Sequence, residues 1–434
     1  KLSGPSAIKV TQSIVETSAK QVWESHKILY GHVVDTKRTH IDEVLILIMK
    51  EPRSFTGEDV VEIHCHGGLI AVQRVLEQVL HNKDTRRALP GEFSQRAVLN
   101  GRLNLTQAEA INDLIAARSE KAAEIAINGI NGEIQKQIKS IHERLLDQLS
   151  EIEARVDFED ELPPLNEQTV KDELMDVHKE LTKLIDDSKR ASWVRNGLKV
   201  ALIGSPNVGK SSLLNRVSKY EKAIVTNIPG TTRDLLESEI VLEGIPFTLI
   251  DTAGIRSTDN KIEEIGINRS KQAMNAADII CLIYDISIGW TKSDQKLLEI
   301  IPKNIPRLLI GNKADIKKKK SGKIPVSQSK KQKNIVLSAL TGEGEDNFIS
   351  SLLYLSGTNT THGLEVALNE RQHDLAKSSI TAIEKTLVVA KEKLPWDFWT
   401  IDLREAIQNL DEITGSEISE AVLEKIFSRF CIGK

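Results

Sequence analysis

The chain has 434 residues, which is too many for one ordinary hydrophobic core, so we expect two or three domains. Apolar residues make up 40% and charged residues 28%, as in soluble globular proteins, and the net charge of -4 excludes a general electrostatic attraction to nucleic acid. Three widely separated cysteines, Cys65, Cys281 and Cys431, argue against a disulfide framework and indicate a reducing compartment. No apolar run reaches the roughly 18 residues of a membrane span.

The first hundred residues contain short apolar runs separated by turn signals. Examples are "VLILIM" at 44–49 and the alternating "VVEIHCH" at 60–66. This pattern predicts a small α+β domain over residues 1–103. Because the chain opens with "KLSGPSAIKV" and no Met, we expect that an N-terminal piece is missing, that the first strand is truncated, and that a targeting segment could have preceded it.

Helical periodicity then dominates two separate stretches of the chain. Apolar residues recur at steps of three and four and define one face of a long helix, at Ile134, Ile138, Ile141, Leu145, Leu149 and Ile152. The helical pattern breaks at "ELPPLN" (161–166), where prolines remove backbone donors. Strand and helix patterns alternate between these stretches. We therefore predict helical segments at 104–197 and 358–434, with a doubly wound α/β domain, 198–357, inserted between them.

The stretch "LIGSPNVGKSSLLN" (202–215) matches GxxxxGKS between a β-like run and a helix-like run. Backbone amides of such a loop point at phosphate oxygens, the glycines allow close approach, the lysine neutralises charge, and the first serine hydroxyl ligates Mg²⁺. The predicted phosphate-binding residues are Asn207, Val208, Gly209, Lys210, Ser211 and Ser212.

Three further motifs follow in order and decide which nucleotide is bound: "TLIDTAG", "IGNKAD" and a guanine-side loop, "LSAL" (337–340). In "TLIDTAG" (248–254), Asp251 suits a water-mediated Mg²⁺ contact and Gly254 can offer its amide to the γ-phosphate. In "IGNKAD" (310–315), Asp315 can accept two hydrogen bonds from guanine N1 and N2, which adenine cannot supply. The predicted GTP- or GDP-binding residues of these motifs are Asp251, Thr252, Ala253, Gly254, Asn312, Lys313, Ala314, Asp315, Ser338, Ala339 and Leu340.

At these motifs the sequence resembles the translation-factor-like GTPases, and in particular the MnmE (TrmE) family of tRNA modification GTPases. The most specific parts of the resemblance are "SFTGEDVVEIHCHGG" (54–68), "LPGEFSQRAVLNGRLNLTQAEAINDLI" (89–115), "GTTRD" (230–234) and the closing "FCIGK" (430–434). The resemblance implies an N-terminal folate-binding domain that also dimerises, a helical domain built from two distant segments, and an inserted Ras-like P-loop GTPase domain.

Ile255 stands where Ras-like proteins carry the Gln that orients the attacking water, so another group must hold that water. By resemblance this group is Glu263, with Glu264 as a helix-surface alternative. No arginine finger is evident, and the resemblance implies a K⁺ ion in its place. The implied K⁺ ligands are Asn207, Thr226, Ile228 and Thr231, within a GTP-binding loop of Thr226, Asn227, Ile228, Pro229, Gly230, Thr231 and Thr232. Asn207 could instead be a loop-capping amide.

The expected Mg²⁺ ligands are the hydroxyl groups of Ser211 and Thr232.

The alternation in "VVEIHCH" places Glu62, His64 and His66 on one strand face and Val61, Ile63 and Cys65 on the other. A metal site there would need a further ligand cluster, which the sequence does not offer. The resemblance instead assigns Glu62 to the pterin ring of a tetrahydrofolate derivative, in its 5-formyl or methylene form. The other implied folate contacts are Lys1, Arg102 and Lys434.

Cys431 lies in the closing motif, where a nearby lysine could lower the thiol pKa. By resemblance it is a second catalytic residue beside the one-carbon donor.

The resemblance further implies a homodimer that acts with a flavin-dependent partner of the MnmG (GidA) type on the wobble uridine of certain tRNAs. The product would carry an aminomethyl-type group at C5. A ribosome-assembly or regulatory GTPase would share the nucleotide motifs, but it would need an RNA-binding module such as a KH or OB unit, and none is legible. We expect a cytoplasmic protein, or one of a plastid or mitochondrial matrix if a transit peptide preceded residue 1.

Overall fold

The computed structural model describes residues 1–17, 21–158, 162–163, 165–218, 224–225, 236–251, 274–316, 331–357, 364–416, 420–430 and 433. The chain divides into two compact units. The terminal unit comprises Lys1–Asn112, Gly129–Lys179 and Asp374–Lys434, and the central unit comprises Asp113–Asn128 and Glu180–His373. None of the described helices is long and apolar enough to cross a membrane.

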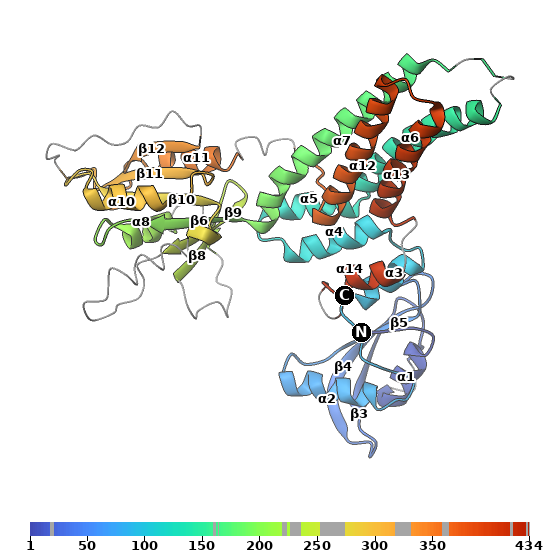
Figure 1. Cartoon of the computed structure of the whole chain (residues 1–434). Coiled ribbons are helices and arrows are strands. Elements are labelled where there is room, and N and C mark those ends of the chain that lie inside the picture. The colour runs from blue at the N-terminus through green and yellow to red at the C-terminus, as the bar shows by residue number, and fades with distance from the viewer. Residues whose placement is uncertain are drawn as a thin grey trace. The chain divides into compact units, whose positions relative to one another are not determined.

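The terminal unit begins with an antiparallel sheet. Among the described residues it has five strands in the order β1-β5-β4-β3-β2. Figure 1 labels β3, β4 and β5 of this sheet. The strands are β1 (Leu2–Ser3), β2 (Val15–Thr17), β3 (Ile28–Val34), β4 (His40–Met49) and β5 (Val60–His64). The helices α1 (Ala7–Ile14) and α2 (Leu69–Leu80) bury their apolar residues against one face of this sheet. The predicted α+β domain is confirmed.

The face assignment of β5 is also confirmed. Val61 and Ile63 pack with the core under α1 and α2, and Cys65 follows them on the same side. Glu62 and His64 lie on the opposite face, where Glu62 Oε2 is 3.5 Å from His64 Nε2. Strict alternation along an extended strand is the cause, since successive side chains point to opposite faces.

Helices make up the remainder of the terminal unit. The helices α3 (Glu92–Leu99), α6 (Glu133–Asp157), α13 (Trp396–Thr414) and α14 (Glu420–Phe427) belong to this unit alone. Four more helices contribute residues to both units: α4 (Leu105–Ala116), α5 (Glu120–Ile130), α7 (Glu167–Asn196) and α12 (Glu370–Lys391). The six apolar residues predicted to line one helix face are all buried in α6, which packs against α13. The predicted break at 161–166 is confirmed, because α6 ends at Asp157 and α7 begins at Glu167.

The last described helix, α14, packs against α3 and α4. Phe427 and Phe430 are buried with Leu105 and Ala108 of α4, and their rings lie 4.8 Å apart. Gly91 permits this approach, since a Cβ there would lie 2.6 Å from the carbonyl oxygen of Phe427. This packing anchors α14 (Glu420–Phe427) and Phe430 within the terminal unit.

The central unit is built on a larger sheet, which is parallel except where β7, β8 and β9 pair antiparallel. Within the described ranges it has seven strands, in the order β12-β11-β10-β6-β9-β8-β7 (Figure 1). The strands are β6 (Leu198–Ile203), β7 (Ile224–Val225), β8 (Leu236–Leu242), β9 (Ile245–Asp251), β10 (Ile279–Asp285), β11 (Arg307–Asn312) and β12 (Gln332–Val336). The helices include α8 (Lys210–Val217), α10 (Lys292–Ile300) and α11 (Glu345–Leu355).

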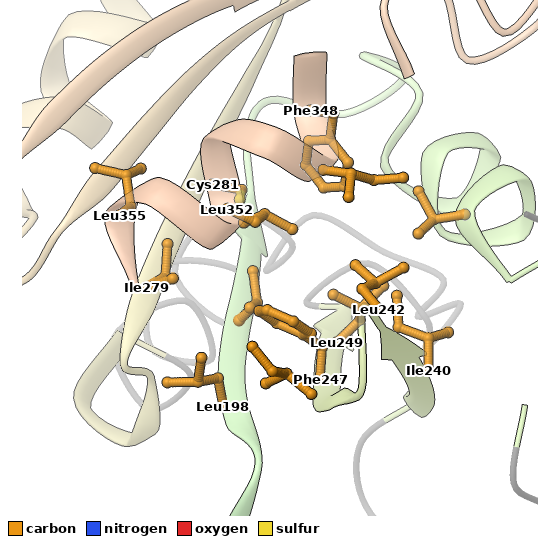
Figure 2. Close-up of a cluster of buried hydrophobic side chains, with 14 of the residues drawn as sticks. Leu198, Ile240, Leu242, Phe247, Leu249, Ile279, Cys281, Phe348, Leu352 and Leu355 are labelled. Atoms are coloured by element: carbon orange, nitrogen blue, oxygen red, sulfur yellow. The ribbon is translucent and has the colours of Figure 1, made fainter. Parts of the chain in front are cut away.

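Both faces of this sheet are covered, as the near-continuous apolar runs of its central strands require. One face packs against α8 and α11 in a core that includes Phe247, Cys281 and Phe348 (Figure 2). The other face packs against α10 through a second cluster that includes Ile203 and Leu282. The predicted doubly wound domain is confirmed. Burial raises the pKa of the Cys281 thiol, which makes it an inert core residue.

Candidate functional site

The phosphate loop connects β6 to α8 and depends on backbone conformations that favour glycine. Gly204 has φ +155°, and a Cβ there would lie 2.2 Å from the carbonyl oxygen of Ile283 on β10. Gly209 has φ +94° and caps α8, so the free amides of the first helical turn face the loop. The loop therefore presents backbone donors of the kind that bind phosphate oxygens.

Lys210 begins α8 and folds back over this loop. Its ammonium donates to the carbonyl oxygens of Gly204 at 2.8 Å and Ser205 at 2.9 Å, and only 7% of the residue is exposed. A lysine held in this way places positive charge at the phosphate loop. Ser211 and Ser212 are exposed on the first turn of α8, where a hydroxyl can face a bound cation.

Asn207 occupies the tip of the loop with φ +62°, in the left-handed region. Its side chain is exposed and makes no hydrogen bond to another described residue. Both interpretations of Asn207, as a K⁺ ligand and as a loop-capping amide, stay predictions.

The base-side motifs meet the phosphate loop through Asn312, the last residue of β11. Asn312 is 1% exposed, its Nδ2 donates to the carbonyl oxygen of Val208 at 2.8 Å, and its Oδ1 accepts from the N–H of Ala339 at 2.9 Å. One buried amide thus ties three of the predicted motifs together, at the carboxyl ends of the parallel strands where ligands of open α/β sheets bind.

Asp315 lies next to this junction. Ser338 Oγ donates to its Oδ1 at 2.5 Å, while the Asp315 residue itself is exposed. The N–H of Ala314 donates to the carbonyl oxygen of Leu337, and Leu340 is 80% exposed. Asp315 thus offers a fixed, accessible carboxylate, as recognition of the guanine N1 and N2 protons requires.

Other predicted residues fall outside the part of the chain that the structure describes. β9 ends at Asp251, as predicted, but its side chain is among them. The remaining residues are Thr226, Asn227, Ile228, Pro229, Gly230, Thr231, Thr232, Thr252, Ala253, Gly254, Glu263, Cys431 and Lys434.

Asp294 on α10 supports the phosphate loop, and the sequence interpretation missed it. This carboxylate is 2% exposed, accepts from Thr291 Oγ1 at 2.7 Å, and accepts from Ser205 Oγ of the loop at 3.2 Å. Thr291 and Asp294 form a capping box at the start of α10. The sequence "TKSD" (291–294) has the spacing that predicts a capping box, whereas the contact with Ser205 depends on the fold.

A second cluster of predicted residues lies in the terminal unit. Lys1 Nζ is 3.8 Å from Glu62 Oε1, and it lies over the rings of Phe55 at 4.3 Å and Phe93 at 5.1 Å. The side chain of Glu62 is 32% exposed and is also adjacent to His64. The structure therefore brings two of the four predicted folate-contacting residues together beside two aromatic rings.

A cavity of about 500 Å³ adjoins this cluster. Its lining includes Lys1, Phe93, Arg87 and Gly433, from both ends of the chain. Arg102 is exposed at the turn after α3, where its N–H donates to the carbonyl oxygen of Ala97 at 2.8 Å.

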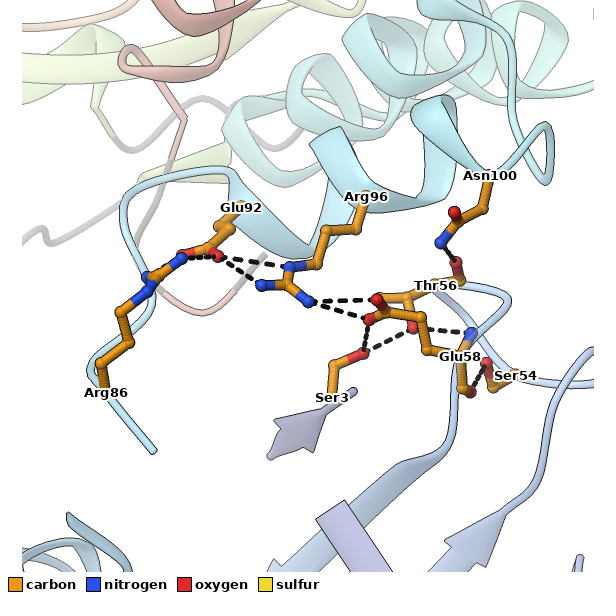
Figure 3. A network of polar contacts seen from close by, with 8 residues as sticks. All are labelled: Ser3, Ser54, Thr56, Glu58, Arg86, Glu92, Arg96 and Asn100. Carbon is orange, nitrogen blue, oxygen red and sulfur yellow. Dashed lines mark hydrogen bonds and ion pairs between the residues drawn. The ribbon is translucent and has the colours of Figure 1, made fainter. Parts of the chain in front are cut away.

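The wall of the cavity is held by a network of charged groups around Glu92 (Figure 3). Arg86 donates to both carboxylate oxygens of Glu92, at 2.6 and 2.8 Å, and Arg96 donates to Glu92 Oε1 at 3.0 Å. The hydrogen bonds from Arg86 are the largest influence on the pKa of Glu92. Together with those from Leu89 N–H and Arg96 they overcome burial and lower this pKa to about 2. Glu92 is therefore fully ionised at neutral pH.

Arg96 extends the network to the sheet. Its Nη1 donates to Glu58 at 3.1 and 3.2 Å, and Ser3 Oγ of β1 donates to Glu58 Oε2 at 2.8 Å (Figure 3). Asn100 Nδ2 donates to the carbonyl oxygen of Thr56, 2.8 Å away. These contacts join α3, β1 and the loop before β5, and they fix the elements that carry Lys1 and Phe55.

Comparison with known proteins identifies the family. The family model of the MnmE helical domain matches residues 105–431, and the family model of the GTP-binding protein TrmE N-terminus matches residues 1–102. A tRNA modification GTPase MnmE of Prochlorococcus marinus (strain NATL2A) is 60% identical over 436 residues, covering 100% of this chain and 94% of that protein. The chain belongs to the MnmE family of tRNA modification GTPases.

Other relatives carry the same name. The MnmE of Synechococcus sp. (strain CC9605) is 57% identical over 434 residues and covers 100% of this chain and 95% of that protein. A solved structure of Era in complex with MgGDPNP and part of 16S ribosomal RNA is 25% identical over 43% of this chain and 66% of that one. Its TM-score is 0.28, which is too low to support a structural argument.

Proposed function

We propose that this chain binds and hydrolyses GTP as part of a tRNA modification. The observation that carries the proposal is the junction at Asn312, where one buried side chain joins the phosphate loop to both base-side loops. Lys210 supplies positive charge at the phosphate side, and Asp315 supplies an accessible carboxylate at the base side. A family of tRNA modification GTPases that spans the whole chain supplies the biological role.

The finer mechanism within this proposal concerns the cations. Mg²⁺ would be held by Ser211 and Thr232, with a water-mediated contact to Asp251. K⁺ would be held by Asn207 together with Thr226, Ile228 and Thr231, and it would neutralise charge that develops between the β- and γ-phosphates. The exposed amide of Asn207 supports this assignment. Glu263 would orient the attacking water in place of the glutamine that Ile255 replaces.

The terminal unit would bind a tetrahydrofolate derivative in its 5-formyl or methylene form. The pterin ring presents an amide and an amino proton, which suit the carboxylate of Glu62, and the flanking rings of Phe55 and Phe93 offer apolar contact. The nearby cavity of about 500 Å³ has a volume typical of small-molecule sites. Gly433 lines it, and Cys431 and Lys434, its neighbours in the sequence, are proposed to act at the same site.

The proposed product is a wobble uridine that carries an aminomethyl or carboxymethylaminomethyl group at C5. Two partners are proposed with it: a second copy of this chain, and a flavin-dependent protein of the MnmG (GidA) type. The apolar residues Leu69 and Ile70 at the start of α2 are 81% and 67% exposed, which supports an association through the terminal unit.

The experiment that tests the proposed function is nucleoside analysis of wobble uridine in tRNA from cells that lack this protein. We expect the C5-modified nucleoside to be lost, to return when the wild-type chain is restored, and to stay absent with Lys210→Ala. Normal modification in the deleted strain would overturn the proposal.

A further inference from the structure

Asp285 is a buried carboxylate at the nucleotide site that lies outside all the recognised motifs. It is the last residue of β10, is 8% exposed, and is paired in register with Asn312 of β11. The N–H of Ile286, which follows it, donates to the carbonyl oxygen of Asn312 at 3.0 Å. Asp285 therefore lies directly beside the start of the base-recognition loop.

Both oxygens of this carboxylate are engaged. Oδ2 accepts from Lys313 Nζ at 2.6 Å, and Oδ1 accepts from the N–H of Ser287 at 2.9 Å and from its Oγ at 2.6 Å. Burial would raise the pKa of Asp285, but the hydrogen bonds from Lys313 and Ser287 outweigh burial and lower it. The contact with Lys313 is therefore an ion pair in a partly buried setting, where charge pairs are only weakly screened.

Lys313 has a backbone conformation that needs such support. Its φ is +68°, in the left-handed region that residues other than glycine and asparagine rarely adopt. This turn sets the direction of the chain over the next two residues, which end at Asp315. If Lys313 relaxed to a right-handed conformation, the carboxylate of Asp315 would move away from its hydrogen bond with Ser338.

We propose that Asp285 is a positioning residue for base recognition, which pairs with Lys313 and so holds the turn that places Asp315 beside guanine. The inference rests on the proposed function, since it concerns the same nucleotide site. Asp285 acts through Lys313 and does not itself touch the nucleotide.

The test uses the full chain with Asp285→Asn, which keeps the size of the side chain and removes its charge. Affinities for GDP and for inosine diphosphate are measured by displacement of a fluorescent GDP analogue, because hypoxanthine lacks the 2-amino group that Asp315 would bind. We expect GDP affinity to fall by about 10-fold and inosine diphosphate affinity to fall less, so that the preference for guanine decreases.

Ser287→Ala is the matched control, since it removes a hydrogen bond from the other carboxylate oxygen and leaves the ion pair intact. We expect it to keep the wild-type preference for guanine. Thermal unfolding of each variant separates loss of stability from loss of selectivity. An unchanged preference in Asp285→Asn, or an equal fall in both affinities, would overturn the proposal.

A double-mutant cycle tests the route through Lys313. If Asp285 acts by way of that ammonium, Asp285→Asn and Lys313→Ala together should cost no more GDP affinity than Lys313→Ala alone. Additive losses would contradict this route. A wild-type chain that binds neither nucleotide would instead refute the proposed function itself, so the two failures are distinguishable.

Discussion

Asn312 and Val208 are 104 positions apart in the sequence, yet the Asn312 side chain donates to the Val208 carbonyl oxygen at 2.8 Å. The same side chain accepts a hydrogen bond from the N–H of Ala339. Asn312 is 1% exposed, so water cannot readily reach these two partners. If the Asn312 amide were removed, the Val208 carbonyl and the Ala339 N–H would each be left without a hydrogen bond. The phosphate loop and the base-side loops therefore keep their spacing through one amide.

Asn312→Ala should weaken both nucleotide binding and folding. Leaving a buried carbonyl and a buried N–H unpaired costs about 1 to 3 kcal/mol each, so we expect the chain to lose stability and GDP affinity to fall by at least about 10-fold. Urea unfolding and a fluorescent GDP titration measure the two effects. The control is Asn347→Ala, which truncates an exposed asparagine on α11. Wild-type affinity in Asn312→Ala would contradict the bridging role.

Asp315→Asn should exchange the base preference. An amide offers one acceptor and adds a donor, so it cannot accept from both guanine N1 and N2, but it can pair with the extra carbonyl of xanthine. We expect GTP affinity to fall by about 100-fold or more and xanthosine triphosphate affinity to rise. Competition binding with the two triphosphates measures both changes in one variant. Retained discrimination in favour of GTP would refute the assignment of Asp315 to the base.

Glu92→Gln should destabilise the terminal unit in a pH-dependent way. The folded-state pKa of Glu92 is about 2, below its ordinary value of 4.5, so its ionised form stabilises the fold fully above pH 4.5. This contribution is lost as the pH falls from 4.5 towards 2. We expect a loss of about 1 to 2 kcal/mol at pH 7, discounted because Arg86 is partly exposed to solvent.

Urea unfolding of wild type and Glu92→Gln between pH 7 and pH 3 measures this effect. The difference between the two proteins should shrink as the pH falls below 4.5. Glu424→Gln, at an exposed position on α14, serves as the control and should show little change. A difference that stays constant over this pH range would show that the charge of Glu92 does not stabilise the network.

GTP hydrolysis should depend on K⁺ and not on Na⁺. A cation coordinated by Asn207 would supply the positive charge that an arginine finger gives elsewhere, so its loss should slow hydrolysis by about 100-fold or more. Single-turnover rates in potassium and sodium buffers of equal ionic strength measure the effect. We expect Asn207→Ala to remove the stimulation by K⁺. Equal rates in the two salts would eliminate this mechanism.

Cys431→Ser should abolish or sharply reduce tRNA modification while GTP binding and hydrolysis stay close to wild type. The preceding Phe427 and Phe430 are buried against α4, so the closing segment starts from a fixed point rather than from a frayed end. Nucleoside analysis of tRNA and a GTPase assay on the same preparation separate the two activities. Full modification by the serine variant would reduce Cys431 to a packing role.

The sequence by itself determined the features that depend on local spacing. The phosphate loop needs only the glycines and the lysine at fixed offsets, and the buried face of α6 follows from a 3.6-residue period. The alternation in β5 likewise predicted that Glu62 and Val61 point to opposite faces of the sheet. These are properties of a few consecutive residues, so no knowledge of the rest of the fold was needed.

Only the tertiary structure decided which surfaces meet. The sequence analysis grouped 104–197 with the helical domain, whereas Ala122 and Ala191 from that stretch pack in the core of the central unit. The pairs Asp285 with Lys313 and Arg96 with Glu58 are likewise separated by 28 and 38 positions. Such contacts follow from strand order and helix packing, since a charged residue carries no local signal that identifies a distant partner.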